Sequence, residues 1–159
     1  MNIENKNYFS LIIWIVGLIV IGSVIGSLTK PEISTWYSTL NRAELTPPNY
    51  VFPIAWTILY GIIGACGWLI WSAQTFPELK GIKTLYATQL ILNWSWTPLF
   101  FGYHLTGISM IVLGAMDILV GALIFLAYRK MKVVSLLMIP YLSWILFASY
   151  LNFYIWWCN

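Results

Sequence analysis

The sequence predicts an all-α integral membrane protein, with residues 1–159 forming one domain built as a bundle of five transmembrane helices. Hydrophobic residues make up 60% of the chain and charged residues only 8%, whereas about a quarter of the residues of a soluble protein are charged. Five apolar stretches each approach the roughly 20 residues that a helix needs to cross a bilayer. Ten tryptophans are distributed among and between these stretches, which predicts an unusually aromatic interior.

The five apolar stretches leave no room for a separate soluble domain. We expect helices over residues 9–28, 51–73, 85–102, 108–128 and 133–156. Pro53 suits the first turn of the second helix, whereas Pro98 and Pro140 fall inside the third and fifth helices and predict kinks there. The first stretch is longer than the roughly 7 to 15 apolar residues of a signal peptide, so a retained helix is favoured over a cleaved leader.

The few charged residues indicate an orientation. Those on the side of the N-terminus and of the second and fourth loops are Lys6, Lys80, Lys83, Arg129, Lys130 and Lys132. Lys30 and Arg42 lie on the opposite side. The positive-inside rule therefore predicts a cytoplasmic N-terminus if the protein resides in an inner membrane. A net charge of +3 is too small and too scattered to indicate a nucleic-acid partner.

Glycine spacing predicts close helix contacts. Gly22 and Gly26 form a G-x-x-x-G pattern on the first helix, which lets another backbone approach closely. The spacing leaves open whether that backbone belongs to the same chain or to a second subunit. Gly61, Gly64 and Gly67 favour the same interpretation for the second helix.

The one long loop that we expect, residues 29–49, contains Trp36 and Tyr37 followed by Pro47 and Pro48. The proline pair forces an extended backbone and excludes a helix there. Two interpretations remain open. The aromatic pair rests at the membrane interface, or the loop is a lid over an intramembrane cavity.

Polar and aromatic residues recur at helical spacing on three of the predicted helices. Amides that faced lipid would lack hydrogen-bond partners, so these stripes should face inward. Inward aromatic residues often form only a core, but flat aromatic walls beside amides and small residues favour a cavity for a large planar apolar ligand. The stripes are Trp56, Tyr60 and Gly64; Gln89, Asn93, Trp96 and Phe100; and Tyr141, Trp144, Ala148 and Asn152.

Asp117 is the one carboxylate within the predicted spans. An ionised aspartate at the bilayer centre costs roughly 2.5 to 3.5 kcal/mol, so it must face protein or be neutral. It is either a ligand or proton site, or a hydrogen-bonded strut between helices.

Cys66 and Cys158 have no metal-ligand or disulfide spacing, and His104 is the sole histidine, in a short loop. The sequence therefore predicts no metal site and no catalytic triad.

Short motifs over nearly the whole chain resemble the translocator protein/tryptophan-rich sensory protein (TspO/MBR) family. Each motif is short, but their order, their spacing and the five-helix setting are together specific. The motifs are Trp36-Tyr37, Leu45 to Pro48, Val51-Phe52-Pro53 with Trp56 and Leu59-Tyr60, Gln89-Leu90 with Leu92-Asn93-Trp94, Phe100-Phe101-Gly102, Asp117, and Pro140-Tyr141-Leu142 with Trp144, Phe147-Ala148 and Leu151-Asn152.

The resemblance implies a five-helix bundle, commonly a homodimer, that binds porphyrins such as protoporphyrin IX and drug-like ligands, with no obligatory cofactor. It places Trp36, Tyr37, Pro47 and Pro48 in a lid. It assigns Trp56, Tyr60, Asn93, Trp144 and Ala148 to the pocket. It favours a bacterial membrane over the mitochondrial outer membrane. In mitochondrial relatives a basic residue follows the tyrosine of a sterol motif; none follows Tyr154 here, so cholesterol binding is not expected.

Three functions are consistent with these expectations. We favour a receptor or sensor for a tetrapyrrole. A light- and oxygen-dependent porphyrin-degrading enzyme would use Trp56 and Trp144 as redox-active or stacking residues. A porphyrin or lipid transporter is disfavoured because no internal repeat is present. In each case Arg42 and Lys30 are candidates for contacting porphyrin propionates, unless they only face lipid headgroups.

Overall fold

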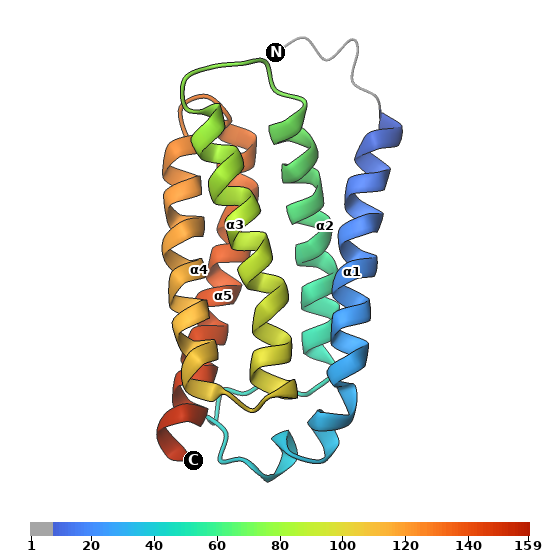
Figure 1. The fold of residues 1–159 in the computed structure, drawn as a ribbon, viewed down its shortest axis with the longest axis vertical. Coiled ribbons are helices and arrows are strands. Elements are labelled where there is room, and N and C mark those ends of the chain that lie inside the picture. Colours follow the sequence, from blue (N-terminus) through green and yellow to red (C-terminus); the bar gives the residue numbers. More distant parts are fainter. Residues whose placement is uncertain (1–7) are drawn as a thin grey trace.

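The computed structural model describes residues 8–159, and Lys6 lies outside the described residues. Its elements form an all-helical bundle whose long axes run side by side (Figure 1). The predicted fold class is confirmed. The elements are α1 (Tyr8–Ser34), η1 (Tyr37–Thr39), α2 (Val51–Trp71), α3 (Leu79–Thr97), η2 (Pro98–Gly102), α4 (Thr106–Ala127) and α5 (Lys132–Cys158).

Within the described part of the chain, α1, α2, α4 and α5 are long and apolar enough to cross a membrane. The remaining long helix, α3, is more polar than these four. It has Lys80 and Lys83 in its first turns, and Gln89 and Asn93 in its middle. Both amides are buried, at 0% and 2% exposure. The other helices therefore shield the polar face of α3 from lipid, as expected for amides in a bilayer.

Two helix boundaries differ from the expected ones because the apolar stretches mark the hydrocarbon and not the helix ends. The first helix continues past Leu28 to Ser34 and includes Pro31. The hydroxyls of Ser34 and Thr35 donate to the Pro31 carbonyl, at 3.0 and 3.1 Å, and cap the end of the helix. The long loop is thus residues 35–50 and contains η1. At the other end of the bundle, α3 begins at Leu79 and not at residue 85.

Pro98 changes the local helix geometry, as expected for a proline inside a predicted helix. Residues Pro98–Gly102 form a π-helical turn, and the Tyr103 amide donates to the Pro98 carbonyl at 2.9 Å. Such turns are rare and accommodate one extra residue per turn. This turn contains Phe100, which is 2% exposed. Pro140, by contrast, lies inside a helix that runs unbroken from Lys132 to Cys158.

Packing follows the order of the chain only in part. Helix α4 packs against α3 and α5, and α2 packs against both α1 and α5. Helix α1 lies at the edge of the bundle (Figure 1), with Leu18 and Thr29 as its buried residues. The loop 35–50, η2 and the C-terminal end of α5 all lie at the end of the bundle opposite the N-terminal end of α1 (Figure 1).

Candidate functional site

A large cavity of about 980 Å³ lies at the loop end of the bundle. Helices α1, α2 and α5 line it together with the end of α3 and the turn η2. Its volume falls at the upper end of the roughly 300–1,000 Å³ typical of small-molecule pockets. Eight of the predicted site residues line it: Lys30, Tyr37, Trp56, Tyr60, Trp96, Phe100, Ala148 and Asn152.

Aromatic rings form a continuous wall of this cavity. The ring centroid of Trp56 lies 5.7 Å from that of Tyr60 and 6.4 Å from that of Trp96. The Trp96 ring stacks on Phe100 at 5.5 Å, and Phe100 meets Phe101 edge-on at 4.8 Å. Aromatic pairs at such distances stabilise one another and hold a rigid apolar surface. The wall therefore suits a flat apolar ligand.

A chain of buried hydrogen bonds fixes the aromatic wall from behind. The Tyr60 hydroxyl donates to Asn93 Oδ1 at 2.6 Å, and Asn93 Nδ2 donates to the Tyr141 hydroxyl at 2.9 Å. Tyr141 in turn donates to Gln89 Oε1 at 2.8 Å. These contacts join α2, α3 and α5. Asn93 therefore supports the cavity through Tyr60 and is not itself among the lining residues.

Asn152 holds a second junction at the cavity wall. Its Oδ1 accepts a hydrogen bond from Trp96 Nε1 at 3.1 Å, and its Nδ2 donates to the Thr106 carbonyl at 2.8 Å. One amide thereby links α3, α4 and α5. With both ends of the amide occupied and 1% exposure, its part in the cavity is to orient the Trp96 ring.

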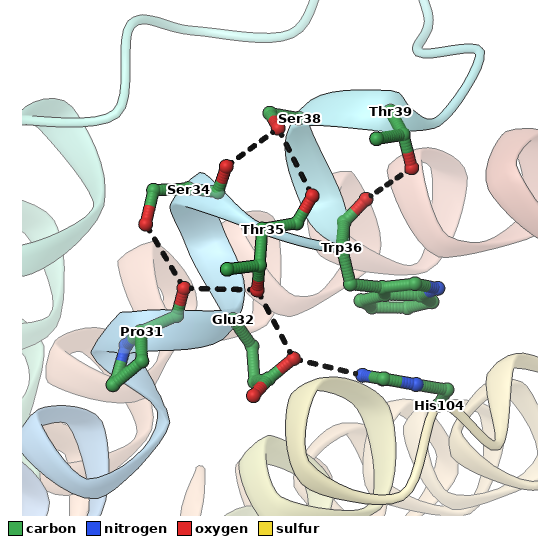
Figure 2. A network of polar contacts seen from close by, with 8 residues as sticks. All are labelled: Pro31, Glu32, Ser34, Thr35, Trp36, Ser38, Thr39 and His104. Carbon is green, nitrogen blue, oxygen red and sulfur yellow. Dashed lines mark hydrogen bonds and ion pairs between the residues drawn. The ribbon is translucent and has the colours of Figure 1, made fainter.

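The loop 35–50 is fixed over the turn η2 by aromatic contacts. Trp36 stacks on His104 with ring centroids 4.1 Å apart and meets Phe100 at 5.5 Å. His104 Nε2 lies 3.2 Å from Glu32 Oε2, and Figure 2 shows Glu32 between His104 and the hydroxyl of Thr35. We call Glu32, Trp36 and His104 the latch. It connects the end of α1 to the segment between η2 and α4.

His104 adopts a φ of 56°, a left-handed conformation that is uncommon for residues other than glycine.

The other end of the loop is hydrogen-bonded to the end of α5. The backbone amide of Asn41 donates to Asn159 Oδ1 at 2.9 Å, and Asn159 Nδ2 donates to the Asn41 carbonyl at 3.2 Å. Latch and amide pair together hold the loop across the end of the bundle, in the position of a lid.

Tyr37 is the residue of η1 that lines the cavity. It is 5% exposed, and its ring lies 5.4 Å from that of Phe101. Burial raises the pKa of its hydroxyl above the usual value, and the nearby Arg42 guanidinium partly opposes this shift. The guanidinium carbon of Arg42 lies 5.3 Å from the centre of the Tyr37 ring, a cation–π contact. The phenol is therefore neutral at physiological pH.

Several predicted site residues lie outside the cavity lining. Trp36 covers Phe100 from the lid. Trp144, expected beside Ala148, packs its ring against Phe52 at 6.1 Å and Phe147 at 5.9 Å. The Trp144 ring, one helical turn before Ala148, therefore packs against aromatic side chains of α2 and α5 and does not line the cavity. A separate, open hollow of the lid contains Arg42, Pro47 and Pro48.

Asp117 lies between α4 and α5 and not in the cavity. Its Oδ2 accepts a hydrogen bond from Ser149 at 2.8 Å, while its buried Oδ1 has no partner among the described residues. This contact matches the alternative of a strut between helices. The described residues also contain no group of three His, Cys, Asp or Glu side chains that could hold a metal.

The part of the cavity that α1 contributes was not predicted from the sequence. Gly22, Ser23, Gly26, Ser27 and Thr29 line it, but their helix has an apolar composition all around. The small side chains were the available signal, because small residues leave space beside a helix. Phe101 and Thr57 are further lining residues that lie beside predicted ones.

Comparisons with known proteins place this architecture in a family. The model of the TspO/MBR family matches residues 14–158. The chain belongs to the TspO/MBR family. It is 37% identical over 153 residues to the tryptophan-rich protein TspO of Archaeoglobus fulgidus, covering 96% of this chain and 99% of the relative.

Other members of the TspO/MBR family are similar over most of their length. The tryptophan-rich protein TspO of Chlorobaculum tepidum is 38% identical, covering 94% of this chain and 95% of the relative. The translocator protein of Bos taurus is 31% identical, covering 86% of this chain and 82% of the relative. The match to the family model begins inside α1 and extends to the end of α5, so it includes every residue that lines the cavity.

Proposed function

We propose that this TspO/MBR protein is a membrane receptor that binds a porphyrin-like tetrapyrrole in the cavity at the loop end of the bundle. The observation that carries the proposal is the aromatic wall of Trp56, Tyr60, Trp96 and Phe100 in a cavity of about 980 Å³. A tetrapyrrole is a large flat ring with an apolar body, so it can stack on such a wall.

The charge distribution supports the same ligand class. Of the residues that line the cavity, all of them in the described part of the chain, Lys30 alone is charged, and it is exposed. A porphyrin carries its propionates on one edge. An exposed cation beside an apolar cavity satisfies that edge while the ring stays among aromatic side chains.

Filling the cavity tests the proposal. Ala148 lines the cavity and is 8% exposed, so Ala148→Phe adds a ring to the space that the ligand needs. We expect protoporphyrin IX, titrated into purified protein and followed by quenching of tryptophan fluorescence, to bind the variant about tenfold or more weakly, about 1.4 kcal/mol or more. Leu146→Phe is the matched control, because Leu146 lies on the same helix with 51% exposure.

Two results would contradict the proposal: no saturable binding to the unmodified protein, or the same affinity for all three proteins. Absorbance spectra of the complex kept in light and in darkness separate a receptor from a porphyrin-degrading enzyme. We expect identical spectra, because a receptor leaves the ring intact.

A further inference from the structure

The cavity reaches the molecular surface on one side of the bundle. Its lining residues from α3, η2 and α5 are buried or half-buried, whereas many of those from α1 and α2 are exposed. The exposed lining residues above the lid are Ser23, Gly26, Ser27, Lys30, Pro53 and Thr57. The cavity is therefore open along the boundary between α1 and α2.

Close contact between α1 and α2 stops where this opening begins. A Cβ atom on Gly64 would lie 2.8 Å from the Ile15 Cα, and one on Gly67 would lie 2.7 Å from the Trp14 ring. A Cβ on Gly22 would overlap the Tyr60 ring. One turn further along α1, a Cβ on Gly26 would meet nothing within 4 Å.

The opening lies at the level of the hydrocarbon. The apolar part of α1, from Tyr8 to Leu28, is about 30 Å long at 1.5 Å per residue, which matches the roughly 30 Å hydrocarbon core of a bilayer. Ser23 and Gly26 thus lie within the hydrocarbon, and Lys30 lies at the level of the headgroups. Lipid, and not water, faces this side of the cavity.

Two hydroxyl groups at the opening, those of Ser27 and Thr57, are already hydrogen-bonded inside their own helices. The Ser27 hydroxyl donates to the Val24 carbonyl at 2.8 Å, and the Thr57 hydroxyl donates to the Pro53 carbonyl at 2.8 Å. An apolar molecule that passes them leaves no buried donor or acceptor unpaired. The small side chains also leave no bulky group across the opening.

We propose that the ligand enters the cavity sideways from the bilayer, through a portal between α1 and α2 bounded by Ser23, Gly26, Ser27, Pro53 and Thr57. The proposal rests on the ligand binding proposed above and names the source of the ligand, an apolar molecule dissolved in the membrane. A porphyrin whose ring lies in the hydrocarbon and whose carboxylates lie at the headgroups has the same depth as the portal and Lys30.

Obstructing the portal tests its use. Gly26→Leu places a side chain at the opening, where its Cβ would meet nothing within 4 Å. Gly17→Leu is the matched control, because a Cβ there also meets nothing within 4 Å but Gly17 does not line the cavity. Stopped-flow mixing of proteoliposomes with protoporphyrin IX-loaded phosphatidylcholine vesicles gives association and dissociation rates. We expect Gly26→Leu to slow both rates equally, on the order of tenfold, as an added steric barrier does.

Loosening the lid tests the competing route. His104→Asn removes the ring that stacks on Trp36 and places there a residue that tolerates positive φ. We expect it to leave both rates unchanged. Faster rates in His104→Asn, or unchanged rates in Gly26→Leu, would overturn the portal. A change in Gly26→Leu confined to dissociation would also overturn it, because that result marks an ordinary lining residue. Failure of the proposed function is distinct, since the unmodified protein then shows no saturable binding.

Discussion

The two cations near the lid, Lys30 and Arg42, have different surroundings. Lys30 lines the cavity at its rim. Arg42 lies over the Tyr37 ring and lines the open hollow of the lid with Pro47 and Pro48. Because Arg42 contacts the Tyr37 ring and is not itself among the residues that line the cavity, its guanidinium stabilises the lid and does not reach a ligand beneath it. Of the two cations that were candidates for contacting propionates, Lys30 is therefore the one that we retain in the proposal.

Lys30→Gln should weaken binding of protoporphyrin IX several-fold, about 1 kcal/mol, because the charge-assisted contact lies at an exposed rim. Binding of the uncharged dimethyl ester should not change. Titrations of both ligands, followed by tryptophan fluorescence, measure the difference. Arg42→Gln is the control and should affect acid and ester alike. If Arg42→Gln weakens only the acid, the assignment of the contact to Lys30 is wrong.

At the scale of elements, glycines on α2 determine how α1 attaches to the bundle. Backbone atoms of Ile15 and Trp14 lie against Gly64, at 2.8 and 2.9 Å from an added Cβ. Backbone cannot move aside as a flexible side chain can. Gly61, three residues earlier on the same helix, has nothing within 4 Å. The same residue type thus has a packing function at one position and none at the other.

Gly64→Leu should separate α1 from α2 and lower stability by about 1–3 kcal/mol or more, the cost of overpacking a tight contact. Gly61→Leu should leave stability nearly unchanged because its side chain points into open space. The midpoint of thermal unfolding in detergent measures both variants. Equal midpoints for the two variants would show that the contact between α1 and α2 does not limit stability.

At the scale of the whole molecule, the features that could be predicted are those with a characteristic length or a regular spacing along the chain. Apolar length identified the helices, and the spacing of Gln89, Asn93 and Trp96 identified a face that must be buried. The direction of Trp144 could not be predicted, because its position on the stripe of Ala148 is compatible with packing against Phe52 as well as with the cavity.

The lid was beyond prediction in its details, since a loop has no period. Proline content predicted an extended segment, but the contacts that hold it depend on residues far apart in the chain. His104 stacks on Trp36, and Asn159 pairs with Asn41. The contribution of α1 to the cavity was also missed, because an edge helix of uniform apolar composition has no polar face to indicate its orientation.

The arrangement of charges predicts the orientation of the whole bundle. Lys80, Lys83, Arg129, Lys130 and Lys132 lie at the end that also bears the start of α1, and Cys158 lies at the lid end (Figure 1). When the protein is expressed in a bacterial inner membrane, the positive-inside rule places the lid end outside. Cys158 is half-buried, whereas Cys66 is 0% exposed and should not react.

A membrane-impermeant maleimide should therefore label Cys158 in intact cells. In a Cys158→Ser background, Tyr128→Cys places a thiol at a position with 59% exposure at the opposite end and leaves every positive charge in place. We expect its labelling only after the membrane is permeabilised, and no labelling of Cys158→Ser alone under either condition. If Tyr128→Cys is labelled in intact cells and Cys158 of the unmodified protein is not, the orientation is the reverse of the predicted one. The cavity and Lys30 would then face the cytoplasmic leaflet, so the ligand would enter from that leaflet.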